Sequence, residues 1–141
     1  MVLSREELKK AMIEWELAWN RHDIDGVMAL FHKDIFFEHW HGANVSGEEN
    51  LRVAWTPWFK DHGNFKFTTE DLIIDETAQK VLYQWEFNWR SLERGFEGKH
   101  EKRRGVDVVH FKDGKIIKKV TYSKTAIEID GQKVRCQAVG A

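Results

Sequence analysis

The sequence places one carboxylate, Asp107, inside a predicted strand whose neighbours are valines. A carboxylate in such surroundings is either paired with a cation or has its pKa raised, because burial penalises the charged form. Both outcomes are common at reactive sites. Asp107 is therefore the first candidate for an acid or a hydrogen-bond donor. The structural alternative is an ion pair with Arg103 or Arg104, which would lower the pKa of Asp107 instead.

The Asp113-Gly114 pair that follows this strand predicts a tight hairpin, which brings a second polar side chain towards Asp107. With a two-residue loop, Val120 lies opposite Asp107 and Tyr122 lies opposite Gly105. Tyr122 would then lie diagonally from Asp107 on the same face of the sheet, within reach of a long side chain. We therefore expect the Tyr122 phenol to be a second donor at the site.

Two histidines, His39 and His41, are spaced so that both would point to one face of a strand. This spacing can hold a metal ion, but no third ligand is evident, so no metal is expected. Because imidazole titrates near neutral pH, His39 is a candidate proton carrier. A slip of one residue in strand register would turn it to the opposite face, so its orientation stays open.

Seven tryptophans and nine phenylalanines in 141 residues indicate a large core, an interface or a ligand cavity. The clearest aromatic stripe lies on one predicted strand, where Tyr83, Trp85, Phe87 and Trp89 share a face. We expect Trp85 and Phe87 to line a pocket and Trp89 to lie at its rim. The opposite face of that strand is of mixed polarity, which suits solvent or a wet dimer interface.

A first helix is expected ahead of the strands. Ser4 and Glu7 form a capping box, in which each side chain satisfies a free backbone N–H of the other. The helix that follows carries an apolar face that includes Trp15 and Trp19. It should end near Asn20.

Two shorter helices are predicted next. Asp23 is expected to cap a short helix directly after the first one. A second capping box over residues 46–49 should begin a helix that carries Trp55. Pro57 cannot continue that helix unbroken, so we expect a new turn there, capped by Thr56.

The rest of the pattern predicts strands. One is expected at residues 34–40, followed by a loop at 42–46, and after Gly63 the apolar residues alternate with period two. Further strands are expected near residues 80–90, 98–111 and 115–129, and Asp130-Gly131 suggests a short hairpin at the end. This order favours a single α+β domain over residues 1–141, with N-terminal helices on a strongly curved, mostly antiparallel sheet that encloses a pocket.

Three segments together resemble the NTF2-like superfamily, in its SnoaL-like and ketosteroid-isomerase-like branch. They are residues 15–25, which resemble the first helix and its Asn-x-x-Asp junction, residues 30–34, and the late hairpin 107–116. The resemblance implies a cone-shaped fold with an apolar pocket, often dimeric through the sheet. It does not imply one reaction, because members include isomerases, cyclases, dehydratases, dehydrochlorinases, epoxide hydrolases and proteins without chemistry.

The resemblance also implies roles for single positions. Asp107 falls where ketosteroid isomerases place a protonated Asp, His39 where they keep the general-base Asp, and Trp15 where they have the oxyanion Tyr. Two of these three positions depart from the isomerase, so steroid isomerisation is not expected. Asp23 falls at the Asp of the dehydrochlorinase dyad, although a helix cap is the favoured interpretation. The spacing of Arg104 and Asp107 differs from that of limonene epoxide hydrolases and argues against epoxide hydrolysis.

The hypothesis is a small-molecule pocket protein. It would be a cofactor-independent acid–base enzyme of isomerase, cyclase or lyase type that acts on an apolar polycyclic or polyketide-like substrate. The catalytic candidates are His39, Asp107 and Tyr122. The candidate substrate-binding residues are aromatic: Trp15, Trp19, Trp55, Trp85, Phe87 and Trp89. The alternatives are a module that binds a small ligand without turnover and a protein-interaction module, which exposed tryptophans at 40, 55 or 58 would support.

Composition excludes several other classes. The formal charge is −1, with 22 basic and 23 acidic residues, so no field attracts a nucleic acid. No apolar run is as long as a membrane span and no secretory leader is evident, so neither a membrane nor export is expected. Cys136 is the only cysteine, which suits a reducing, cytoplasmic location. An uncovered sheet face is costly, so we expect a homodimer through the sheet.

Overall fold

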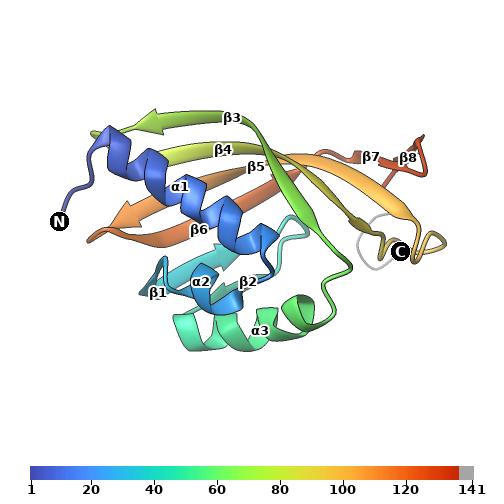
Figure 1. Ribbon diagram of the computed structural model, residues 1–141, viewed down its shortest axis with the longest axis horizontal. Helices are drawn as coiled ribbons and strands as arrows, with labels where there is room; N and C mark the ends of the chain where they lie inside the picture. The colour runs from blue at the N-terminus through green and yellow to red at the C-terminus, as the bar shows by residue number, and fades with distance from the viewer. Residues whose placement is uncertain (137–141) are drawn as a thin grey trace.

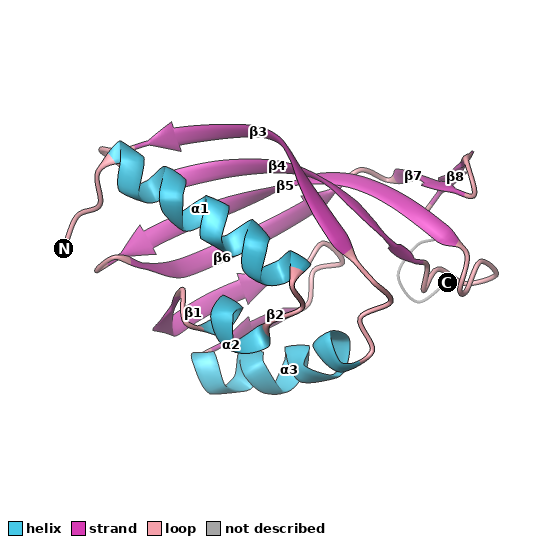
Figure 2. Ribbon diagram, in the orientation of Figure 1, coloured by secondary structure: helices cyan, strands magenta, loops and turns pink. Residues whose placement is uncertain are grey.

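A curved mixed sheet, crossed by one long helix and flanked by two shorter ones, forms the molecule (Figures 1 and 2). The computed structural model describes residues 1–136. In chain order the elements are α1 (Arg5–Asn20), α2 (Ile24–Met28), β1 (Phe31–Glu38), β2 (Asn44–Ser46), α3 (Glu48–Lys60), β3 (Lys66–Asp75), β4 (Lys80–Arg90), β5 (His100–Lys112), β6 (Lys115–Ser123), β7 (Ala126–Ile129) and β8 (Gln132–Arg135). None of these helices is long and apolar enough to cross a membrane.

The main path of the sheet runs in the order β2-β1-β6-β5-β4-β3. Strand β1 pairs with β6 in parallel, and every other pair is antiparallel. The small hairpin β7–β8 joins the sheet through β5. The expected α+β class with a curved, mostly antiparallel sheet is confirmed, and α1 lies across the concave face (Figure 2).

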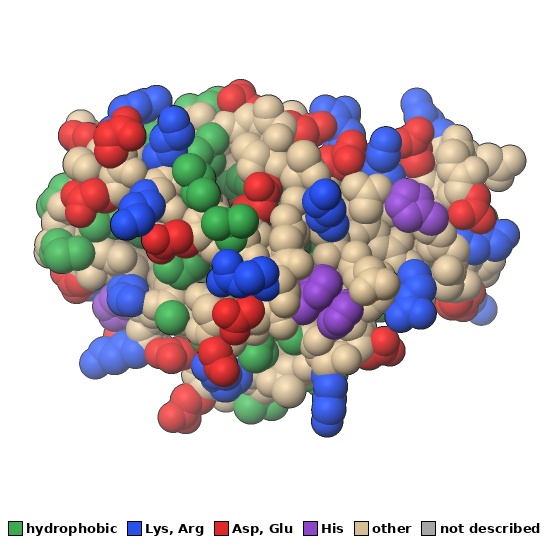
Figure 3. Space-filling view, in the orientation of Figure 1, with side chains coloured by type: hydrophobic (Ala, Val, Ile, Leu, Met, Phe, Trp, Pro, Cys, Tyr) green, Lys and Arg blue, Asp and Glu red, His purple; other side chains and the backbone are tan. Residues whose placement is uncertain are grey.

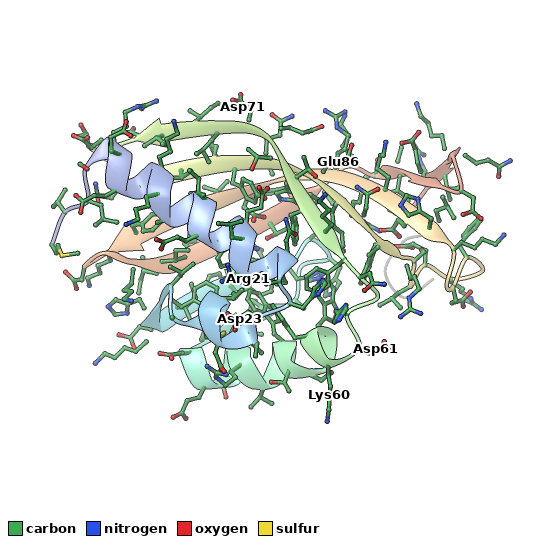
Figure 4. All side chains as sticks on the ribbon, viewed as in Figure 1. Arg21, Asp23, Lys60, Asp61, Asp71 and Glu86 are labelled. Carbon is green, nitrogen blue, oxygen red and sulfur yellow. The ribbon has the colours of Figure 1, made fainter. Side chains whose placement is uncertain are left out.

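The two N-terminal helices begin as expected. Ser4 accepts a hydrogen bond from the Glu7 backbone, and the Glu7 carboxylate accepts one from the Ser4 backbone, so the capping box is present. Asp23 accepts from the Gly26 N–H at 3.0 Å and caps α2. Arg21 lies 3.7 Å from the Asp23 carboxylate, at the junction of α1 and α2 (Figure 4). The cap interpretation of Asp23 is therefore confirmed.

The expectations for α3 are wrong at two points. Gly47 is its N-cap and no side chain caps it, so residues 46–49 form no capping box. The helix also continues through Pro57 instead of restarting at Thr56. Pro57 removes the donor that would pair with the carbonyl of Val53. Val53 is 74% exposed, so water can satisfy that carbonyl and the helix is not forced to break.

The strands differ from the expectation mainly at their ends. Strand β1 begins at Phe31, three residues early, and the expected loop at 42–46 contains β2. The expected strand at 115–129 is two strands, β6 and β7. Asp130 and Gly131 both have positive φ, at 50° and 80°, which is the conformation of a type I′ hairpin turn. The short C-terminal hairpin is confirmed.

A β-bulge between β5 and β6 decides which side chains face the concave side. Lys112 pairs with Lys115 as the two-residue loop predicts, but the register shifts by one residue beyond Phe111. Thr121 therefore lies opposite Asp107, and Tyr122 lies opposite Val106. The prediction that Tyr122 shares a face with Asp107 is wrong, because one extra residue on a strand turns every later side chain to the other face. Tyr122 is 57% exposed on the outer face.

The core fills the space between the concave face of the sheet and the helices. Phe37, Lys119, Val109 and Val81 form one row across four strands, and Thr121, Asp107 and Tyr83 form the next. Helix α1 covers these rows with Leu8, Met12, Trp15 and Trp19, all buried. On the surface, acidic and basic side chains are interspersed over the face seen in Figure 3.

Candidate functional site

A cavity of about 240 Å³ lies between α1, α3 and the concave face of the sheet. Its wall is mostly aromatic, and its polar lining comes from two strands, β5 and β6, and from the loop after β1. The lining residues are Trp15, Trp19, Phe37, His39, Trp40, His41, Ala43, Val45, Ala54, Trp55, Trp58, Phe67, Trp85, Asp107, Lys119 and Thr121. This volume is just below the range of about 300–1,000 Å³ that is usual for ligand pockets, so the cavity suits a small molecule.

Asp107, in the middle of β5, is the buried carboxylate of this cavity. Its side chain accepts hydrogen bonds from Trp85 Nε1 at 3.1 Å and from Thr121 Oγ1 at 2.8 Å. Lys119 Nζ lies 3.4 Å from the second oxygen. Asp107 is 2% exposed, so these contacts replace its water shell. The expected role as a hydrogen-bond donor does not fit this arrangement, because all these partners donate to the carboxylate.

The two arginines considered as partners of Asp107 pair elsewhere. Arg103 contacts Glu101 at 3.0 Å and Glu93 at 2.8 Å. Arg104 lies on the outer face and pairs with Glu70 at 2.7 Å. The cation beside Asp107 is Lys119, so the predicted ion pair exists but with a different residue.

Lys119 is a lysine with its ammonium inside the molecule. Its side chain is 7% exposed, and Nζ donates to Thr121 Oγ1 at 2.7 Å. Nζ also lies 4.7 Å from the centre of the Phe37 ring and 5.6 Å from that of Trp15. Burial lowers the pKa of Lys119, and the Asp107 carboxylate only partly offsets this. Lys119, Thr121 and Asp107 thus form a hydrogen-bonded line at the cavity wall.

Gly105 is what allows Trp85 to reach Asp107. The two residues lie opposite each other on β5 and β4. A Cβ atom on Gly105 would come within 2.5 Å of the Trp85 ring and would also meet the carbonyl oxygen of Tyr122. The absence of a side chain therefore lets the indole lie flat over the strand and direct its N–H at the carboxylate.

His39 lies directly after β1, two residues beyond Phe37, and faces the same cavity as Asp107. Burial lowers its pKa to about 3, with smaller contributions from His41, Lys119 and Arg103. The imidazole is therefore neutral near physiological pH. Its Nδ1 accepts a hydrogen bond from the His41 backbone N–H at 3.4 Å, so Nε2 carries the proton and is the donor of the ring. A base with so low a pKa carries protons poorly at neutral pH, so the sequence-based role of proton carrier fits less well than that of a hydrogen-bond donor.

No metal site forms around these histidines. The rings of His39 and His41 stack with their centres 3.9 Å apart. Among residues 1–136, no three or more His, Cys, Asp or Glu side chains are placed to hold a metal ion.

Four of the six aromatic candidates line the cavity: Trp15, Trp19, Trp55 and Trp85. Phe87 and Trp89 do not. Phe87 is fully buried in the core, and Trp89 Nε1 donates to the buried Glu101 at 2.6 Å. The Trp19 indole N–H is buried without a hydrogen-bond partner, alone among the buried side-chain nitrogens and oxygens of residues 1–136.

Sequence reasoning missed Lys119 and Thr121. The register expected from the tight turn places Val120 opposite Asp107 on the inner face. It therefore assigns Lys119 and Thr121, on either side of Val120, to the outer face. One signal was present, because Lys118 and Lys119 are adjacent on a strand and adjacent side chains point to opposite faces. One of the two lysines had to face the interior.

Residues 10–119 match the SnoaL-like domain. The chain belongs to this family. A comparison with curated proteins found no match.

Solved structures of SnoaL-like and NTF2-like proteins share the fold. The epoxide hydrolase/cyclase-like enzyme SalBIII, which acts in pyran ring formation in the polyether salinomycin, is 17% identical with a TM-score of 0.74, over 89% of this chain and 98% of that one. An NTF2-like protein of unknown function from Burkholderia pseudomallei is 14% identical with a TM-score of 0.71, over 86% and 92%. An LEH-like epoxide hydrolase from M. tuberculosis is 18% identical with a TM-score of 0.67, over 84% of each chain.

Proposed function

We propose that this SnoaL-like protein is a cofactor-independent acid–base enzyme that enolises a small apolar carbonyl compound. The observation that carries the proposal is the ion pair of Lys119 and Asp107, joined by Thr121, on the wall of an aromatic cavity. A buried ion pair is a poor source of stability, because desolvation offsets most of its attraction. Paired titratable groups in a cavity are typical of reactive sites.

The pair supplies both groups that enolisation needs. The Asp107 carboxylate takes a proton from the carbon next to the carbonyl, while Lys119 donates a hydrogen bond to the carbonyl oxygen, where negative charge develops. The neutral His39 donates a hydrogen bond from Nε2 to a substrate oxygen and so orients the molecule. Depending on where the proton returns and which bond breaks, the outcome is isomerisation, cyclisation or elimination.

The cavity sets the size and polarity of the substrate. Its apolar wall and its volume of about 240 Å³ favour a ligand of one or two rings. This is smaller than the polycyclic substrate expected from the sequence. SalBIII, one of the structural neighbours, acts in pyran ring formation, and a pyran is a single six-membered ring.

The alternative of a protein-interaction module is not favoured by the tryptophans. Trp55 is 7% exposed, and Trp40 and Trp58 are half-buried and line the cavity, so most of the surface of these three side chains is turned away from a partner. Binding of a small ligand without turnover uses the same cavity and is an outcome of the experiment below.

The experiment follows hydrogen–deuterium exchange at the α-carbon of 1-indanone by NMR in deuterated buffer. We expect the protein to accelerate exchange and Asp107→Asn to slow it by about 10²-fold or more, the usual contribution of a general base. Tyr122→Phe, on the outer face, is the matched control and should leave the rate unchanged. Exchange no faster than in buffer, with indanone still quenching tryptophan fluorescence, would overturn the enzyme proposal in favour of binding alone.

A further inference from the structure

We propose that Lys119 is an amine nucleophile that forms an imine with a carbonyl compound in the cavity. The inference deepens the proposed function, because it makes the activation of the carbonyl group covalent. It rests on where the amine lies and on what surrounds it.

The first argument is placement. Nζ of Lys119 is held over the face of Phe37 and near Trp15 and Trp55, at 4.7, 5.6 and 6.0 Å from the ring centres. The same rings line the cavity, so an aromatic carbonyl compound that packs on them would bring its carbonyl carbon to the amine. Lysine side chains are rarely buried, and a buried one beside a cavity is the arrangement that Schiff-base chemistry uses.

The second argument is the path for the proton. An ammonium is not a nucleophile, so Lys119 must lose a proton before it reacts. Nζ donates to Thr121 Oγ1 at 2.7 Å, and that hydroxyl donates to Asp107 Oδ1 at 2.8 Å. Burial also lowers the pKa of Lys119, which makes the loss easier. The hydrogen-bonded chain from Lys119 through Thr121 to Asp107 can therefore carry the proton away from the amine and return it later.

The step balances without any further reactant. The Nζ lone pair forms a bond to the carbonyl carbon, and the proton lost from nitrogen reaches the carbonyl oxygen through Thr121 and Asp107. The carbinolamine then loses its hydroxyl as water. The proton first taken from the lysine ammonium returns from Asp107 through Thr121 to that oxygen, the C–O bond breaks, and the nitrogen lone pair forms the C=N bond of a protonated imine. Hydrolysis by water reverses the sequence and releases the carbonyl compound.

The test traps the imine by reduction. The full-length protein is incubated at neutral pH with 2-naphthaldehyde and sodium cyanoborohydride, which supplies hydride to the C=N bond, and the product is analysed by intact mass and peptide mapping. We expect one naphthylmethyl group per chain, located on Lys119. The exposed neighbour Lys118 is the internal control, and Lys118→Ala should label as fully as the unchanged protein.

Two variants separate the amine from its surroundings. Lys119→Met should abolish the single label, and Thr121→Val, which keeps the amine but removes the hydroxyl, should slow labelling by about 10²-fold. If Lys119→Met does not fold, the peptide map of the unchanged protein still shows whether the label is on Lys119. Labels spread over surface lysines with Lys119 unmodified would overturn the proposal.

The aldehyde also separates this inference from the proposed function. 2-Naphthaldehyde has no proton on the α-carbon and cannot be enolised. Labelling at Lys119 without indanone exchange would support the imine and overturn enolisation. Hydrogen–deuterium exchange of 1-indanone without labelling of Lys119 would support the enolisation proposal and overturn the imine proposal.

Discussion

At the scale of single residues, the cavity combines groups that are costly to bury. Lys119 and Asp107 are both buried, and each keeps hydrogen-bond partners in place of water. Replacing either partner alone would leave an uncompensated charge, which usually costs about 3–5 kcal/mol. His39 avoids this cost by remaining neutral, and that neutrality has a measurable effect on the pH dependence of stability.

The free energy of unfolding should fall as the pH drops from about 6.5 towards 3, partly because of His39. The folded protein holds the pKa of His39 near 3, whereas the unfolded chain binds a proton near pH 6.5. Between these values the unfolded state binds the extra proton and is favoured. His39→Gln should therefore make the fall shallower, by up to about 1.4 kcal/mol per pH unit.

Urea unfolding at pH 7, 6 and 5 measures this difference. The exposed His100→Gln is the matched control and should reproduce the slope of the unchanged protein. Equal slopes for His39→Gln and the unchanged protein would show that His39 has the same pKa in the folded and unfolded states and would contradict its burial as a neutral group.

At the scale of elements, the site depends on the packing between β4, β5 and β6. The bulge beyond Phe111 brings Thr121 and Lys119 to the face of Asp107, and Gly105 lets Trp85 lie against the same strand. Neither feature has a chemical role, yet both decide which side chains meet.

Gly105→Ala should destabilise the protein by about 1–3 kcal/mol, the usual cost of overpacking. The added methyl group would meet the Trp85 ring and the backbone carbonyl of Tyr122, and a backbone atom cannot move away cheaply. Thermal unfolding measures the loss. Arg104→Ala, an exposed neighbour on β5, should change stability much less, and a Gly105→Ala protein as stable as the unchanged one would contradict the packing argument.

At the scale of the whole molecule, the outer face of the sheet carries an uncovered apolar stripe. Ile73, Leu82 and Tyr122 are 55%, 39% and 57% exposed, and the half-buried Val106 and Val108 lie between them on β5. Arg104 and Glu70 lie on the same sheet, so a second copy related by a two-fold axis would meet charges of both signs. We propose that two copies of the chain associate through this face.

Sedimentation velocity tests the association. We expect the unchanged protein to sediment as a dimer and Leu82→Glu as a monomer at the same concentration, because a charge in an apolar interface is costly. Leu92→Glu, which changes an equally apolar residue outside the sheet, should remain dimeric. A monomer at every concentration would contradict the proposal.

The sequence by itself determined most of the elements and part of the aromatic cavity wall. Capping residues and turn pairs act over a few positions, so the start of α1, the Asp23 cap and the Asp130-Gly131 hairpin could be predicted from their neighbours alone. The alternation of Trp85 with its neighbours likewise placed it on the inner face, and the order of elements with the segments shared with SnoaL-like proteins predicted the fold.

Only the tertiary structure decided which polar groups meet. A bulge depends on how two strands pair and twist, which no short segment reveals, and it exchanged Tyr122 for Lys119 and Thr121 at the site. The partner of Asp107 and the low pKa of His39 follow from burial, which is a property of the assembled molecule. Local patterns thus placed part of the aromatic wall, whereas strand register and desolvation selected the polar groups inside it.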